Sequence, residues 1–168
     1  NTPSLDPNVR PVIGLPTPSQ LQTQAQFNAS GNLIDVRDSV LFGVKGSLSQ
    51  ADGSLLDVER RGFDQVNLTS DGDLRFLAGT NENGVATGIS TQLLTQGDMT
   101  LRAAQLYPGT QVGARVIAGY LGLGGEISND ILFDPLRTLT IGRTGTADAA
   151  IPYSAFGRLQ LGAATVRQ

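Results

Sequence analysis

A short phrase that recurs along the chain constrains its fold more than any other feature of the sequence. Each copy opens with a turn residue, which is Gly in four of the five, and continues with apolar and polar residues in alternation. Alternation with a period of two is typical of a β-strand with one buried face. The sequence therefore predicts a series of short strands. The copies occupy residues 31–36, 72–76, 97–101, 137–141 and 157–161.

The spacing of the copies indicates how these strands are arranged. Measured between the equivalent Leu or Met of each copy, the gaps are 41, 25, 40 and 20 residues. Apart from the second gap, these values are close to one or two units of about 20 residues, as in a stacked repeat architecture. The spacing predicts a single right-handed parallel β-helix (β-solenoid) of about seven coils and about 34 Å in length. The equivalent residues are Leu33, Leu74, Met99, Leu139 and Leu159.

A β-sandwich or an antiparallel barrel also contains many short strands. Hairpins would place paired strands only a few residues apart, however, and the aromatic content of 5% is low for a sandwich core. The solenoid is therefore the favoured all-β architecture. Its predicted inward-facing core consists of Leu74, Phe76, Met99, Leu101, Leu139, Ile141, Leu159 and Leu161.

Two stretches depart from the repeated phrase. Residues 1–26 contain five of the eight prolines and a Gln-rich run, and they predict an extended connector because proline removes backbone donors. Residues 27–168 form the predicted solenoid segment. Within it, residues 105–133 interrupt the phrase and predict one irregular excursion, which either carries a binding surface or only covers the solenoid flank.

The composition excludes several classes of function. The chain has 12 basic and 15 acidic residues, and it lacks the clustered Lys and Arg that nucleic-acid binding needs. It contains neither His nor Cys, which excludes Ser-His-Asp triads, Cys–His pairs, disulfides and metal sites built from these side chains. We expect no cofactor, no resident metal and no enzymatic activity.

Four residues are candidates for a functional surface. Asp71 and Asp73 are two positions apart, hence about 6.6 Å apart along an extended segment, which is near the separation of glycosidase carboxylates. The same Ser-Asp-Gly-Asp sequence is typical of a turn, and this structural interpretation is favoured over catalysis. Tyr107 and Tyr120 lie in the predicted excursion, where they would contribute to a binding surface.

Several phrases resemble the filamentous-haemagglutinin family of large exoproteins, which leave Gram-negative bacteria by two-partner secretion. The similarity spans residues 48–168 and is densest at 62–76 and 101–108, with further phrases at 139–143 and 154–161. The resemblance implies a right-handed parallel β-helix within a long adhesin-like fibre. It also implies export through an outer-membrane transporter, engaged by parts outside this chain, and display on or release from the cell surface.

The expected function is that of a stalk segment in a secreted surface adhesin, presenting or contributing a surface for a cell-surface glycan or protein. One alternative is a polysaccharide-binding or polysaccharide-degrading β-helix that uses Asp71 and Asp73. Another is a module that threads or delivers a toxin within the same exoprotein class. We also expect end-to-end self-association, because a coil separated from its neighbour exposes an unpaired strand edge.

Overall fold

The computed structural model describes residues 25–43, 46–49, 55–58, 62–86, 88–124, 130–145 and 154–168. These residues form sixteen β-strands, β1 to β16, and no helix. This part of the chain accordingly has no helix long and apolar enough to cross a membrane. The prediction of an all-β chain is confirmed for the residues described.

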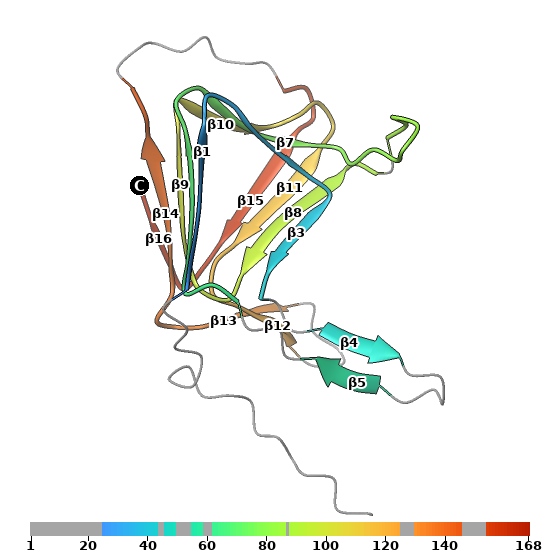
Figure 1. Cartoon of the computed structure of the whole chain (residues 1–168), viewed down its shortest axis with the longest axis vertical. Helices are drawn as coiled ribbons and strands as arrows, with labels where there is room; N and C mark the ends of the chain where they lie inside the picture. The colour runs from blue at the N-terminus through green and yellow to red at the C-terminus, as the bar shows by residue number, and fades with distance from the viewer. Residues whose placement is uncertain are drawn as a thin grey trace, which may run out of the picture.

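Three parallel sheets, called sheets A, B and C, contain twelve of the strands (Figure 1). Sheet A contains, in spatial order, β1 (Gln26–Gly31), β6 (Gln65–Ser70), β9 (Asp98–Ala103), β14 (Thr138–Arg143) and β16 (Thr165–Arg167). Sheet B contains β2 (Ile34–Arg37), β7 (Asp73–Leu77) and β10 (Gln105–Pro108). Sheet C contains β3 (Ser39–Phe42), β8 (Ser90–Thr95), β11 (Gly113–Ile117) and β15 (Arg158–Gly162).

The chain visits the three sheets in a repeated order. β1, β2 and β3 lie one in each sheet, and the same is true of β6, β7 and β8 and of β9, β10 and β11. β14 then lies in sheet A and β15 in sheet C, and β16 returns to sheet A. The register places Phe27, Val66, Met99, Leu139 and Val166 in one column of sheet A. Successive circuits of the chain therefore span 39, 33, 40 and 27 residues.

The predicted unit of about 20 residues is wrong, because one circuit contains three strands. Met99 and Leu139 do share a column of sheet A, but Leu74 lies in sheet B and Leu159 in sheet C, and Leu33 lies just before β2. All three sheets bury the same kind of alternating strand, so the phrase does not reveal which sheet contains it. The five strands of sheet A span about 19 Å, not the predicted 34 Å.

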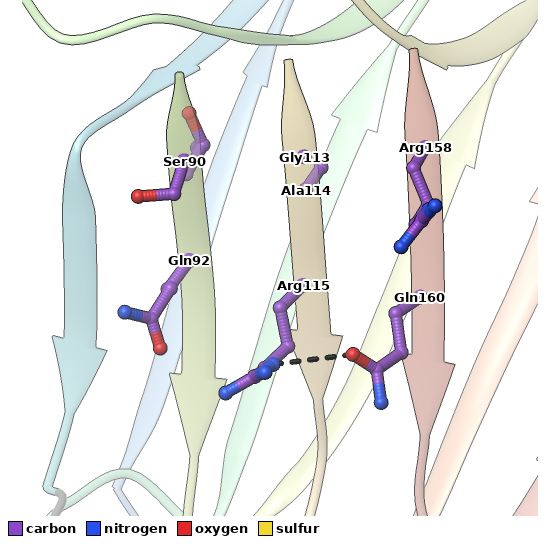
Figure 2. Close-up of a pocket in the computed structure, with 8 residues that line it drawn as sticks. Ser90, Gln92, Gly113, Ala114, Arg115, Arg158 and Gln160 are labelled. Atoms are coloured by element: carbon purple, nitrogen blue, oxygen red, sulfur yellow. Dashed lines mark hydrogen bonds between the residues drawn. The ribbon is translucent and has the colours of Figure 1, made fainter. Parts of the chain in front are cut away.

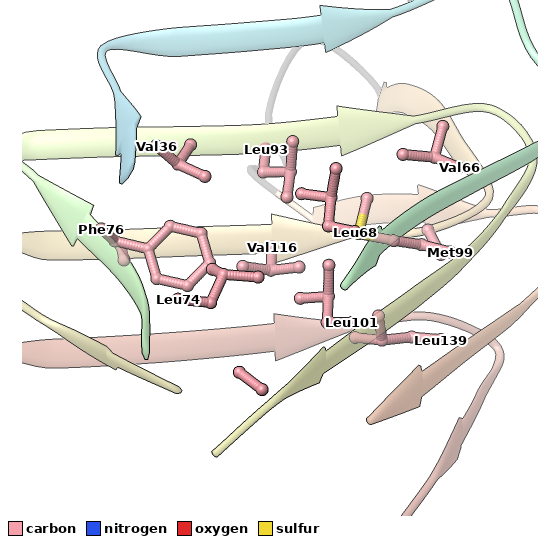
Figure 3. Close-up of a cluster of buried hydrophobic side chains, with 13 residues drawn as sticks. Val36, Val66, Leu68, Leu74, Phe76, Leu93, Met99, Leu101, Val116 and Leu139 are labelled. Atoms are coloured by element: carbon pink, nitrogen blue, oxygen red, sulfur yellow. The ribbon is translucent and has the colours of Figure 1, made fainter. Parts of the chain in front are cut away.

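Apolar side chains from all three sheets meet in one interior cluster (Figure 3). Strand β9 shows the alternation that builds it. Met99 and Leu101 are fully buried there, whereas Thr100 is partly exposed and Arg102 is exposed. The period-two prediction is therefore confirmed in this strand, and its polar residues face away from the cluster.

Most of the predicted core residues lie in this cluster. Ile141 and Leu159 are partly buried and pack against it. Leu161 is 38% exposed, because β15 is the last strand of sheet C and pairs only with β11. Five of the eight predicted positions are 0% exposed, namely Leu74, Phe76, Leu139, Met99 and Leu101.

The corners between sheets bring backbones of neighbouring circuits into contact. A Cβ on Gly97, just before β9, would lie 2.2 Å from the carbonyl oxygen of Asp64. A Cβ on Gly72, just before β7, would lie 2.6 Å from the carbonyl oxygen of Asn32. Only glycine fits at either position, so the Gly-Asp step of the repeated phrase reflects this close approach of backbones.

Two antiparallel hairpins leave the circuits. β4 (Gly46–Ser49) pairs with β5 (Leu55–Val58), and β12 (Tyr120–Gly124) pairs with β13 (Asp130–Phe133). The second hairpin returns to sheet C, since a Cβ on Gly162 of β15 would lie 3.0 Å from the Phe133 ring. Leu94 and Ile117 are paired in sheet C next to Gly162 and are 5% and 0% exposed, although they lie outside the interior cluster. One end of the outer face of sheet C is therefore apolar and covered.

The range predicted as an excursion, 105–133, divides in the structure. Its first part contains β10 and β11, which are regular members of sheets B and C, and only Tyr120–Phe133 forms a hairpin outside them. Pro108 fits in β10 because this strand lies at the edge of sheet B, where a missing N–H is tolerated. The predicted connector, residues 1–26, lies outside the described residues except for Ala25 and Gln26, and Gln26 begins β1.

Candidate binding surface

The outer face of sheet B carries a column of paired polar side chains. The register aligns Asp35, Arg75 and Tyr107 on β2, β7 and β10. Arg75 donates from Nε to Asp35 Oδ1 at 2.7 Å and from Nη2 to Asp35 Oδ2 at 2.9 Å. The Tyr107 hydroxyl donates to Asp73 Oδ2 at 2.9 Å. These bonds tie the three strands of sheet B together on the outside of the stack.

The environment of this column favours the protonated forms of Tyr107 and Arg75. Burial raises the pKa of the Tyr107 phenol, and its hydrogen bond to Asp73 raises that pKa further. The hydrogen bond to Asp35 raises the pKa of Arg75 and outweighs the lowering by desolvation. At neutral pH the phenol is therefore a neutral donor and the guanidinium is charged.

The structure brings together two of the four predicted site residues. Tyr107 and Asp73 are hydrogen-bonded, as described above. Asp71 is exposed in the turn before β7, and its backbone N–H donates to the Gly31 carbonyl at 3.0 Å. Tyr120 begins the β12 hairpin, which follows sheet C, so it does not join the others. Because Asp73 already accepts a bond from Tyr107, this geometry favours a structural role for that carboxylate.

A second group of ion pairs lies at the corner between sheets C and A. Arg137 Nη1 lies 2.8 Å from Asp64 Oδ1 and 3.3 Å from Asp98 Oδ2. Arg137 Nε lies 3.8 Å from Asp134 Oδ2, whose residue is buried. Desolvation lowers the pKa of Arg137, but the contacts with Asp64 and Asp98 outweigh it and leave that pKa raised. One guanidinium thus links three successive circuits, which is a structural role.

The outer face of sheet C differs from both, because it contains a shallow hollow of ≈ 380 Å³ (Figure 2). In one column of the sheet, Arg115 lies between Gln92 and Gln160. Arg115 Nε donates to Gln160 Oε1 at 3.3 Å. In the adjacent column, Gly113 lies between Ser90 and Arg158. The outward lining residues are Ser90, Gln92, Gly113, Arg115, Arg158 and Gln160.

The hollow forms where the middle strand has no side chain. A Cβ on Gly113 would meet no atom closer than the Ile89 carbonyl oxygen at 3.8 Å, which is an ordinary van der Waals contact. Gly113 is also absent from the described residues with positive φ. Unlike Gly97, Gly113 is therefore not required by backbone contact, and its effect is to leave space between Ser90 and Arg158.

The hollow is also distinguished by its charge. The sequences of β3, β8, β11 and β15 contain no Asp or Glu. Arg37, Arg75 and Arg137 each lie within ion-pair distance of a carboxylate, whereas Arg115 and Arg158 have no such partner among the residues the structure describes. The outer face of sheet C is thus locally positive on a chain whose net charge is −3.

The sequence-based prediction does not include Arg115 or Arg158. They lie 43 positions apart, and only the register of β11 with β15 brings them to neighbouring strands. The outward polar positions of residues 113–117 and 158–162 are visible as alternation in the sequence. That signal does not say which strands pair, so it could not have identified the hollow.

Two further findings bear on function. Within the described ranges, no group of three or more Asp or Glu side chains is placed to hold a metal ion. No protein-family model, no curated protein and no solved structure matches the chain. The chemistry of the outer faces is therefore the basis for inferring what the protein does.

Proposed function

We propose that residues 27–168 form a segment of a right-handed parallel β-helix and serve as a structural stalk. The observation that carries this proposal is the repeated circuit, in which consecutive strands enter three parallel sheets in the same order. Right-handedness is proposed because parallel strands joined by crossovers adopt that hand in about 98% of cases. A stack in which each circuit contacts only its neighbours can be lengthened by adding circuits, and a stalk needs this property.

The proposed setting is the surface of a Gram-negative bacterium. The resemblance of residues 62–76 and 101–108 to filamentous-haemagglutinin-type exoproteins supports secretion through an outer-membrane two-partner transporter. In this setting the stalk projects adhesive regions and contributes adhesive surface of its own. The hollow of sheet C is the feature that supports the second role, because it offers hydrogen-bonding and cationic groups on an accessible face.

Rigidity is the property that tests the stalk. The chain has no cysteine, so spin labels can be attached to introduced cysteines without background. Asn28 and Arg167 lie in one outward column of sheet A, four strand spacings apart. Labels at Asn28→Cys and Arg167→Cys should give one narrow distance distribution, for a Cα separation of about 19 Å.

Thr140 provides the matched control, because it lies in the same column one strand nearer to Asn28. The pair Asn28→Cys and Thr140→Cys should give a separation shorter by about one strand spacing, or about 4.8 Å. Broad or multiple distributions for both pairs would contradict a rigid stack and with it the stalk function.

The degrading alternative predicts catalysis through Asp71 and Asp73, and it has a direct test. We expect no release of reducing ends and no unsaturated product from a panel of bacterial, plant and animal polysaccharides. Release that disappears in Asp73→Asn, while folding is preserved, would replace the structural proposal by an enzymatic one. The conservative substitution retains an acceptor oxygen for the Tyr107 hydroxyl, so the stack itself should survive.

Self-association remains part of the proposal. β16, β10 and β15 are the last described strands of sheets A, B and C, and sheet edges can pair with another chain. Sedimentation velocity over a hundredfold concentration range should show dimers or short stacks that grow with concentration. A monomer at every concentration would contradict this part.

A further inference from the structure

We propose that the hollow on sheet C binds a linear carboxylated polysaccharide, with Arg115 and Arg158 pairing with carboxylates of successive uronic acid units. This inference deepens the adhesive part of the proposed function and rests on it. The side chains around the hollow suit such a ligand. Guanidinium groups pair with carboxylates through two parallel hydrogen bonds, and the amides of Gln92 and Gln160 can exchange hydrogen bonds with sugar hydroxyls.

The charge arrangement points to an external anion. Arg115 is partly exposed and Arg158 is exposed, and the outward face formed by β8, β11 and β15 contains no carboxylate. The only bond recorded for Arg115 is from Nε to a neutral amide oxygen at 3.3 Å. The remaining guanidinium N–H groups of both arginines are available for a ligand on the outside of the sheet. Figure 2 shows them on adjacent strands around the position of Gly113.

The spacing of the two arginines indicates the charge density of the ligand. Arg158 pairs in register with Gly113, so it lies one strand over and two residues back from Arg115. This offset places their Cα atoms about 8 Å apart. Double-stranded DNA carries one charge per about 1.7 Å of axis and would need many more cations than this acidic chain offers. A polymer with isolated carboxylates several ångströms apart matches two arginines.

The surface type argues for a glycan over an acidic peptide. Extended peptides gain affinity mainly from backbone hydrogen bonds at a sheet edge. The hollow lies on the face of β8, β11 and β15, whose backbone groups are already paired between strands. A ligand here must bind through side chains, and those offered are amides, a hydroxyl and guanidinium groups. These are donors and acceptors for hydroxyls and carboxylates.

The decisive substitution is Gly113→Val, because it fills the hollow without removing a polar group. The space around Gly113 accepts a Cβ, and valine suits a strand position, so the fold should be retained. The second variant, Arg115→Gln with Arg158→Gln, removes the cations and keeps hydrogen-bonding side chains. Its matched control is Arg102→Gln with Arg167→Gln, which removes the same charge from the outward face of sheet A.

Binding of the full chain to a defined oligogalacturonate is measured by calorimetry or surface plasmon resonance. We expect the double-arginine variant and Gly113→Val each to weaken binding at least about tenfold, with the sheet A control within about twofold of the parent chain. The methyl-esterified oligomer, which lacks the charges, should also bind at least about tenfold more weakly. Equal binding by all variants, or equal loss in the sheet A control, would overturn the site.

The other ligand classes are arms of the same experiment. Polyglutamate that binds as tightly as the oligogalacturonate would make the hollow a peptide site and overturn the proposal. Heparin that binds at least about tenfold tighter would replace carboxylate by sulfate and also overturn it. The spin-label distances of Asn28→Cys and Arg167→Cys, repeated with Gly113→Val, separate this result from the stalk. Loss of binding with unchanged distances concerns the hollow alone, whereas altered distances concern the stack.

Discussion

The outer faces of sheets B and C are built in the same way and differ in how their charges are arranged. On sheet B, Arg75 lies directly beside Asp35, and Tyr107 bonds to Asp73. On sheet C, Arg115 and Arg158 lie near each other with no carboxylate on their strands. A parallel stack brings residues of one column about 4.8 Å apart, so opposite charges in a column stabilise the stack. A column without the opposite charge leaves its cations to an external ligand.

The largest effect is expected where both faces depend on the same interior. Leu101 is 0% exposed and contributes to the cluster that sheets B and C also line. Leu101→Asp should lower the free energy of unfolding by at least about 4 kcal/mol, because it buries a charge without a partner. The neighbouring changes Thr100→Asp and Arg102→Asp should cost no more than about 1 kcal/mol. Urea melts of the three variants measure this, and equal losses would contradict the alternation in β9.

Two glycines sharpen the comparison between required and optional space. Gly97→Ala should destabilise the protein by about 2 kcal/mol or more, because its Cβ would overlap the Asp64 carbonyl oxygen and the backbone must shift. Gly113→Ala should leave the stability unchanged or raise it by up to about 1 kcal/mol. Thermal melts compare the two. A similar loss for both would mean that Gly113 is structural and that the hollow is a by-product of folding.

The charge ladders themselves should differ in stability by a smaller amount. Arg75→Ala removes a two-bond pair with Asp35 whose side chains are 31% and 27% exposed, so we expect a loss of about 0.5–1 kcal/mol. Arg115→Ala on sheet C should change the stability by less than about 0.5 kcal/mol. High salt should reduce the first loss and leave the second unchanged. If Arg115→Ala proves as destabilising as Arg75→Ala, the two faces are not functionally distinct.

The smallest effect is a pH dependence confined to sheet B. The pKa of Tyr107 is raised in the folded state by burial and by its bond to Asp73. Its stabilising contribution is therefore fully present below the unfolded pKa of about 10 and is lost as pH rises through the folded pKa. Urea midpoints between pH 9 and pH 11.5 should fall more in the parent chain than in Tyr107→Phe. Parallel curves for the two proteins would show that Tyr107 titrates normally.

The prediction of strands and of the inward residues within them held best in the middle of the chain. Leu74, Met99 and Leu139 were expected inside and are fully buried, because alternation reports directly on which face of a strand is covered. Leu161 was expected inside and is partly exposed, since the covering of a strand also depends on its place in the sheet order. The pairing of Asp73 with Tyr107 was not predicted, although both residues were singled out.

The sequence by itself determined that the chain forms short strands with alternating buried and outward residues, and that glycines precede several of them. Only the tertiary structure decided which strands are neighbours, and hence that circuits contain 27 to 40 residues and that Arg115 lies near Arg158. The physical reason is that lengthening a loop costs little free energy, about 0.6 kcal/mol for each doubling of its length. The hairpins β4–β5 and β12–β13 can therefore lie between strands of successive circuits without changing the stack. Separation along the chain consequently carries no reliable record of separation along the stack.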